Sequence, residues 1–183
     1  FVTSSKVYSS PLLVGDKLYF TCNSSDLICL NTSGVLIWKY KSSSPSKLSF
    51  AFNLIKSNLV YDYYNSLSQK LINFFTIHAW GSPNLLNHKY IICSFFSDGV
   101  VAIDKDTGCL AWKVSLGSPS NHLSGVSVTT NYIVATSQSN SIFFINSSGT
   151  VLWKKNLKIL FNSWSNPSID KIEESIYCTT SFY

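Results

Sequence analysis

A glycine followed four residues later by a tryptophan recurs three times, and this spacing constrains the fold more than any other feature. The three pairs are Gly34 and Trp38, Gly108 and Trp112, and Gly149 and Trp153. Each glycine ends a short polar run that begins with Asn or Asp, and apolar residues lie on both sides of that run. This arrangement is typical of β-hairpins. The chain is therefore predicted to repeat one hairpin, with an indole in each outgoing strand.

The clearest copy occupies residues 98–116, where one apolar run ends at Asp104 and another begins after Gly108. A glycine at the end of the corner can adopt the positive φ that closes a short hairpin. The carboxylates of Asp104 and Asp106 can accept hydrogen bonds from nearby amides. The three glycines are thus interpreted as turn residues. They do not indicate a phosphate-binding loop, because no helix is expected to follow them.

Short apolar runs separated by tight turns precede each hairpin, which makes units of four strands. Trp112 and Trp153 are 41 residues apart, a spacing that fits a propeller blade. We predict an all-β fold, namely a partial β-propeller of about four four-stranded antiparallel blades. The predicted segments are the end of a preceding blade at 1–8, blades at 9–40, 82–117 and 118–158, and a truncated blade at 159–183.

The segment 41–81 does not fit this pattern. Trp38 and Trp112 are 74 residues apart, so that about thirty residues are additional between the first two units. The stretch 41–73 contains no Gly and no turn of the blade type. One interpretation is an inserted loop with a short amphipathic helix near 64–74. The other is a degenerate blade, since 74 residues is close to two short repeats.

Residues 102–112, Ala-Ile-Asp-Lys-Asp-Thr-Gly-Cys-Leu-Ala-Trp, resemble the blade pattern of the pyrroloquinoline-quinone-like (PQQ-like) β-propeller family. That pattern has an aliphatic run ending in Asp or Asn, then Thr-Gly, and Trp four residues after the Gly. The other two copies keep Asn, Gly and Trp but carry Ser33 and Ser148 in place of Thr. WD-repeat propellers fit poorly, because no blade ends in Trp-Asp.

Within this family, the openings at 7–11 (Val-Tyr-Ser-Ser-Pro) and 80–83 (Trp-Gly-Ser-Pro) are similar to blade starts in the C-terminal propeller of β-alanine-activating enzymes. Those are adenylate-forming, acyl-CoA-synthetase-like proteins related to aminoadipate-semialdehyde dehydrogenases. The resemblance implies a propeller attached to an acid–amino acid ligase of β-alanine metabolism, with the ligase chemistry outside this stretch. The lack of Met, including at position 1, predicts that the chain is a fragment of a longer protein.

The repeat residues are predicted to have structural roles, and each indole is expected to be buried against the neighbouring blade. They are Gly34, Trp38, Asp104, Gly108, Trp112, Gly149 and Trp153. No catalytic, cofactor-binding or metal-binding residue is predicted. The three histidines, His78, His88 and His122, lack the spacing of a metal site. No nucleophile elbow of the Gly-x-Ser-x-Gly type is present.

Quinoprotein dehydrogenases are the alternative that the family name suggests. In these enzymes the fold holds the quinone and Ca²⁺ with Asp and Asn ligands, often beside two adjacent cysteines. This chain has no Cys-Cys pair, and Asp98, Asp104 and Asp106 fall where hairpin turns need them. We therefore expect no cofactor, and interpret the segment as a non-catalytic scaffold or interaction domain. A PQQ-dependent dehydrogenase fragment and a luminal or periplasmic interaction propeller are the alternatives.

Composition limits the partners. The net charge of +5 is scattered, which argues against nucleic-acid binding. No apolar run approaches the ~20 residues that a membrane helix needs. The expected partners are other blades and domains of the parent chain and a protein partner. The five cysteines form no CxxC pair and are predicted to be buried thiols, which favours a cytoplasmic location. Glycosylation sequons at Asn23, Asn31 and Asn146 would favour a luminal or extracellular one.

Overall fold

The computed structural model describes ten segments of the chain. They are residues 1–3, 5–7, 9–22, 26–42, 81–95, 98–116, 123–137, 141–156, 166–170 and 175–178. Within these segments every regular element is a β-strand. Both interpretations of the segment 41–81, including the helix expected near 64–74, fall almost entirely outside the described residues.

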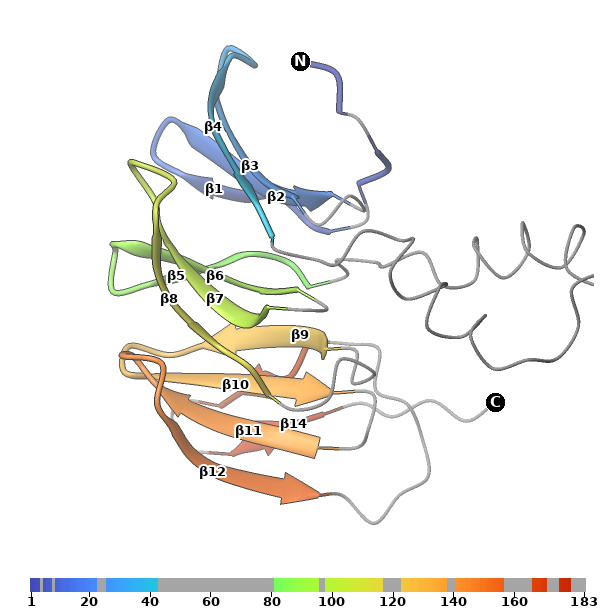
Figure 1. Ribbon diagram of the computed structural model, residues 1–183, viewed down its shortest axis with the longest axis vertical. Helices are drawn as coiled ribbons and strands as arrows, with labels where there is room; N and C mark the ends of the chain where they lie inside the picture. Colours follow the sequence, from blue (N-terminus) through green and yellow to red (C-terminus); the bar gives the residue numbers. More distant parts are fainter. Residues whose placement is uncertain are drawn as a thin grey trace, which may run out of the picture.

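Three antiparallel four-stranded sheets follow one another along the chain (Figure 1). We call them the first, second and third blades. The first contains β1 (Leu12–Val14), β2 (Lys17–Cys22), β3 (Asp26–Asn31) and β4 (Leu36–Lys41). The second contains β5 (Asn84–Leu86), β6 (Tyr90–Phe95), β7 (Gly99–Asp104) and β8 (Leu110–Val114). The third contains β9 (Leu123–Val128), β10 (Tyr132–Ser137), β11 (Ser141–Asn146) and β12 (Val151–Asn156).

Each strand pairs with the next one along the chain, so that the strand order in every blade is the sequence order. A fourth sheet has two described strands, β13 (Ser168–Ile169) and β14 (Ile176–Tyr177), which also pair antiparallel. The prediction of an all-β fold and of a partial β-propeller with four-stranded antiparallel blades is confirmed.

The hairpin between the third and fourth strands is built alike in all three blades. Its glycine has positive φ, which is 78° at Gly34, 73° at Gly108 and 87° at Gly149. The strand pairing shifts by one residue next to each corner, as in a β-bulge. After this shift, each tryptophan pairs with a residue of the third strand of its own blade. The pairs are Trp38 with Cys29, Trp112 with Ala102, and Trp153 with Phe144.

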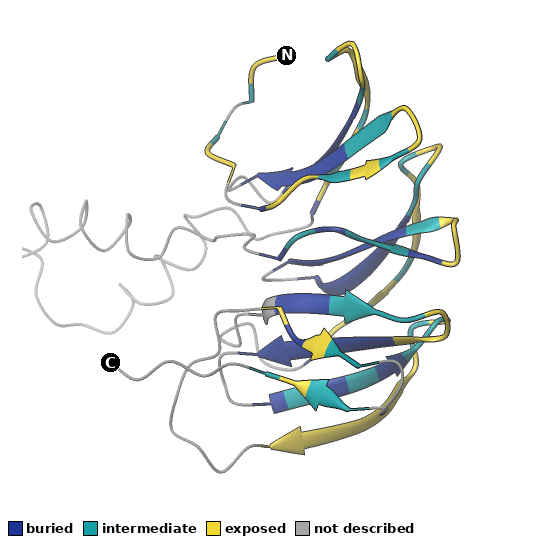
Figure 2. Ribbon diagram, turned by 180° about the vertical axis from the view of Figure 1, so that it is seen from behind, coloured by how far each residue is buried: buried dark blue, intermediate teal, exposed yellow. Residues whose placement is uncertain are grey.

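The core lies between the blades and not inside any one of them. Along β7, Val101 and Ile103 pack toward the first blade, with Tyr19 and Leu27. The alternate residues of β7, among them Val100, pack toward the third blade. Successive strand residues point to opposite faces, so the middle blade is buried on both sides and its strands are continuous apolar runs. Figure 2 shows this burial in the middle blade and the contrast with the exposed β12.

Candidate interaction surface

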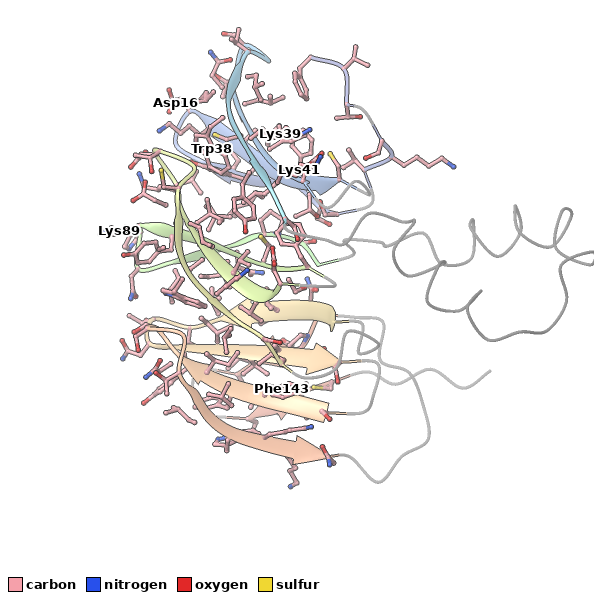
Figure 3. The ribbon with its side chains drawn as sticks, in the orientation of Figure 1. Asp16, Trp38, Lys39, Lys41, Lys89 and Phe143 are labelled. Carbon is pink, nitrogen blue, oxygen red and sulfur yellow. The ribbon has the colours of Figure 1, made fainter. Side chains whose placement is uncertain are left out.

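Two of the repeat tryptophans lie on the glycine corner of the next blade. A Cβ atom added at Gly108 would lie 2.7 Å from the Trp38 ring, and one added at Gly149 would lie 2.7 Å from the Trp112 ring. Trp38 projects from β4 toward the second blade (Figure 3). The glycine therefore serves twice, because it supplies the positive φ of the corner and leaves room for the indole above it.

Trp153 and Gly34 lack this arrangement. The Trp153 side chain is 42% exposed and stacks on Phe144, with 5.1 Å between ring centroids. No atom lies within 4 Å of a Cβ added at Gly34. The expectation that every repeat indole is buried against a neighbouring blade is therefore wrong for Trp153. The physical reason is that no following glycine corner is present among the described residues.

Polar groups of the corner between β7 and β8 contact side chains of the first blade. The carbonyl oxygen of Lys105 accepts hydrogen bonds from the Tyr19 hydroxyl, at 3.0 Å, and from the Trp38 Nε1, at 3.1 Å. Lys17 Nζ lies 2.6 Å from the Asp106 carboxylate. Hydrogen bonds from Lys105 and Lys17 lower the pKa of Asp106, and the bond to Asp106 raises the pKa of Lys17. Burial raises the pKa of Tyr19.

A buried carboxylate, Asp98, joins the same two blades at their other end. It accepts hydrogen bonds from the hydroxyls of Ser42, at 2.8 Å, and Tyr40, at 3.3 Å, and its other oxygen lies 3.2 Å from Lys113 Nζ. Burial, followed by the Asp98 charge, raises the pKa of Tyr40 to about 12. Asp98 lies in the turn before β7, as predicted, and its side chain in addition reaches across to β4.

A lysine follows each repeat tryptophan, and this signal was available in the sequence. Lys39 pairs with the buried Asp26 at 2.8 Å in the first blade, as Lys113 does with Asp98 in the second. In the third blade the strand position of Asp26 is occupied by Ser141, and Lys154 lies over the Phe143 ring at 5.3 Å instead. The lysine points away from the tryptophan, as alternation along a strand requires.

The Asn or Asp that begins each corner hydrogen-bonds within that corner. Asp104 Oδ1 accepts hydrogen bonds from the amides of Thr107 and Asp106, both at 3.0 Å, and these bonds, that of Thr107 most, lower the pKa of Asp104. Asn31 Oδ1 accepts a hydrogen bond from the Val35 amide at 2.8 Å, and Asn146 Oδ1 accepts one from the Thr150 amide at the same distance. These side chains are therefore used in closing the hairpins.

The remaining candidate ligands do not come together. Within the part of the chain that the structure describes, no three His, Cys, Asp or Glu side chains are grouped as a metal site would require. His88 lies in the β5–β6 turn with φ of 53°, and His78 and His122 are outside the described residues. In the same described part, no helix has the length and apolarity needed to cross a membrane.

Three of the five thiols are buried as predicted, those of Cys22, Cys29 and Cys93. Burial raises the pKa of Cys93. Cys178 is half-buried. Cys109 is exposed, which corrects the expectation of burial, because it lies directly after the glycine corner and before β8 begins.

An exposed apolar stripe runs along the outermost strands of the three blades. The large apolar residues two and three positions after each glycine are each more than a third exposed. They are Leu36, Ile37, Leu110, Val151 and Leu152, which we call the outer apolar rim. The strands that carry it, β4, β8 and β12, each stand at the edge of their sheet. Edge strands offer unpaired backbone groups to a partner, and apolar side chains add affinity.

Comparison with known proteins supports the architecture. Residues 97–172 match a family described as outer membrane protein assembly factor BamB. The crystal structure of BamB from Moraxella catarrhalis superimposes with a TM-score of 0.59 over 88% of this chain, at 16% sequence identity. The chain spans 37% of that protein. No curated protein sequence matches. The blades and the structural match define a partial β-propeller, and the family match shows that residues 97–172 are similar to PQQ-like repeats.

Proposed function

We propose that this chain is a non-catalytic interaction segment of a propeller, which holds a protein partner against its outer apolar rim. The observation that carries the proposal is the recurrence of exposed apolar side chains at one position of every blade, on edge strands. A single exposed apolar residue is ordinary on a protein surface, whereas a series aligned across neighbouring elements is typical of a binding site.

The carboxylates on which quinoprotein chemistry would depend are already used within the fold. Asp98 is buried with Ser42 and Lys113, and Asp104 caps its own corner. Asp106 pairs with two lysines at the edge of the blade. These roles favour a structural protein over a dehydrogenase. The name of the matching family, an outer membrane protein assembly factor, also favours a role in assembly with other proteins.

The chemistry of the rim defines the partner. An extended segment with alternating apolar side chains would add backbone hydrogen bonds to an edge strand and place its side chains against Leu110 or Leu152. A protein partner of this kind agrees with the scattered charge, which offers no stripe for a nucleic acid. The three buried thiols support a reducing, cytoplasmic location as part of this proposal.

A finer proposal concerns the parent protein. The openings at 7–11 and 80–83 resemble those of propellers attached to β-alanine-activating, adenylate-forming enzymes, and this resemblance alone supports such a parent. The complete reading frame tests it. An adenylation domain and a carrier domain before residue 1 would support it, and a frame that encodes further blades alone would contradict it.

Site-specific photo-crosslinking tests the interaction. A benzophenone side chain placed at Leu110 should capture a defined protein in extracts of the source cells, and unlabelled chain should compete for this capture. A chain carrying Leu110→Lys should not compete. Leu13 on β1 is also exposed and apolar but lies off the rim, so a benzophenone there serves as the matched control and should capture nothing.

The same purified chain should be titrated with pyrroloquinoline quinone and Ca²⁺ in a dye-reduction assay. The interaction proposal predicts neither saturable binding nor turnover. Quinone binding together with alcohol-dependent dye reduction would contradict the proposal and favour the dehydrogenase alternative. Equal capture from Leu13 and Leu110 would contradict the role of the rim.

A further inference from the structure

We propose that the third blade binds a carboxylate of the partner protein at Lys154, on the side of β12 that faces the second blade. The partner is an extended segment in which an acidic side chain lies between apolar side chains on one face. It is the same partner that the outer apolar rim holds, so the inference rests on the proposed function and adds the charge that the partner carries.

The third blade differs from the other two in its charge. The segment 9–40 contains two lysines and two carboxylate residues, and the segment 82–117 contains three of each. The segment 118–158 contains three lysines and no Asp or Glu. The nearest carboxylates along the chain are those of Asp106 and Asp170. Of the three blades, only the third therefore has positive charge that none of its own residues can neutralise.

The lysine that follows each repeat tryptophan indicates where a carboxylate would bind. In the first blade, Lys39 Nζ lies 2.8 Å from the buried carboxylate of Asp26. In the second blade, Lys113 Nζ lies 3.2 Å from the buried carboxylate of Asp98. Lys154 has the same position in the third blade, and no carboxylate among the described residues forms an ion pair with it. The repeat thus uses this lysine twice to hold a carboxylate and leaves it available once.

The Lys154 side chain lies on the side of β12 that faces the second blade. It is paired with Phe143 on β11, and its Nζ lies 5.3 Å from the centroid of the Phe143 ring. Phe143 belongs to the apolar cluster between the second and third blades, so this side is not an end of the arc. Lys154 is nevertheless exposed, as is all of β12 (Figure 2). Because an ammonium has three N–H donors, one that rests on a ring can still donate to a carboxylate from outside.

The position of Lys154 on an edge strand defines the spacing of groups in the partner. β12 pairs with β11 on one side and forms the edge of its sheet. An extended segment that adds to this edge would place successive side chains on opposite faces. An acidic side chain beside Lys154 would then share its face with the residues two positions before and after it. Apolar residues at these positions suit the rim, whose members Val151 and Leu152 are exposed on the same strand.

The binding of two short peptides to the 183-residue chain tests the proposal. In the first, labelled with fluorescein, threonine alternates with valine, except that glutamate replaces the central valine. The second carries glutamine in place of that glutamate. Fluorescence anisotropy should show that the glutamate peptide binds about fivefold more tightly, the factor for an ion pair at the upper end of the range for exposed pairs. Lys154→Gln should abolish this preference, and Lys154→Arg should retain it. The matched control, Lys155→Gln, removes the same charge from the other face of β12 and should also retain the preference.

A variant of the rim separates this proposal from the proposed function. Leu152→Ser should weaken the binding of both peptides alike, because it removes an apolar contact and no charge. Equal binding of both peptides to the unaltered chain, or a preference that survives Lys154→Gln, would overturn the role of Lys154. The rim would still be supported if Leu152→Ser weakened binding. Failure of both peptides to bind would also overturn the proposal, and capture from Leu110 would then test the proposed function separately. Sedimentation with phosphatidylserine vesicles that is lost equally in Lys154→Gln and Lys155→Gln would overturn it in favour of a membrane surface.

Discussion

The two interfaces between blades share one packing arrangement but differ in their polar contacts. Between the first and second blades, Trp38 Nε1 donates a hydrogen bond to the Lys105 carbonyl, while Lys17 and Asp98 add charged contacts at either end. Between the second and third blades, Trp112 Nε1 is buried and has no hydrogen-bond partner among the described residues. There the Asn84 amide donates to the Val126 carbonyl, at 2.9 Å, beside a large apolar cluster.

This difference separates what the architecture requires from what one interface adds. The indole over glycine and the apolar cluster occur at both interfaces, so they define how one blade packs on the next. The charged contacts occur mainly at the first interface and are therefore not required by the repeat. A buried donor without a partner costs free energy, which makes the second interface more dependent on apolar packing.

Replacing the repeat tryptophans by alanine should give the largest change in the free energy of unfolding. Trp38→Ala and Trp112→Ala should each lower the free energy of unfolding by about 3 kcal/mol, the lower end of the range for a Trp in a core, because both rings are partly exposed. Trp153→Ala should cost less than about 1 kcal/mol in the monomer. Urea denaturation followed by circular dichroism would measure all three. Equal losses at the three positions would contradict the difference between packed and open tryptophans.

Alanine substitutions at the three glycines separate the cost of backbone strain from the cost of a clash with the indole. Gly34→Ala should cost about 1–2 kcal/mol, because alanine at positive φ is strained and has no other conflict. Gly108→Ala and Gly149→Ala carry the same strain and also force a methyl group into the indole above. They should cost about 1–3 kcal/mol more than the Gly34 control. Three equal losses in urea denaturation would show that the indoles do not lie on these corners.

Replacing each indole by phenylalanine sharpens the comparison between the interfaces. Trp38→Phe removes a hydrogen bond worth about 1 kcal/mol in addition to ring area. Trp112→Phe removes a similar area but also a buried donor that lacks a partner, so its cost should be smaller by about that amount. This difference is measured by comparing the urea unfolding midpoint of each variant with that of the unaltered chain, and then the two losses with each other. A larger loss at Trp112 would mean that its Nε1 has a partner after all.

The smallest effect should come from alkaline pH, and it should act on the first interface. The pKa of Tyr40 is about 12 in the folded chain and 10.0 in an ordinary tyrosine. Its contribution to stability is therefore complete below pH 10 and is lost as the pH rises toward 12. Tyr40→Phe should flatten the fall in the urea midpoint between about pH 10 and about pH 12. An unchanged slope would contradict the burial of Tyr40 beside Asp98.

The sequence predicted the local features of the fold well. The glycine corners and the tryptophan four residues after each glycine depend on neighbours along the chain, and both appear in β3–β4, β7–β8 and β11–β12. The capping role of Asp104 was also predictable, because it acts within its own turn.

The contacts between blades were harder to predict from the sequence. The bond from Ser42 to Asp98 joins residues that are 56 apart, and no local pattern specifies it. The lysine after each tryptophan was visible in the sequence, but its buried partner lies on another strand. The exposure of Trp153 could not be predicted either, since it depends on what packs over β12 and not on the repeat itself. The outer apolar rim was not predicted, because the glycine-to-tryptophan spacing does not specify how exposed the residues between them are.

The central claim is that each indole lies on the glycine of the following blade, and proton chemical shifts of the glycines test it most directly. The α-protons of Gly108 and Gly149 should be displaced upfield by the ring currents of Trp38 and Trp112, while those of Gly34 should have ordinary shifts. Trp38→Ala should restore Gly108 and leave Gly149 unchanged. Ordinary shifts at all three glycines in the unaltered, folded chain would contradict the account.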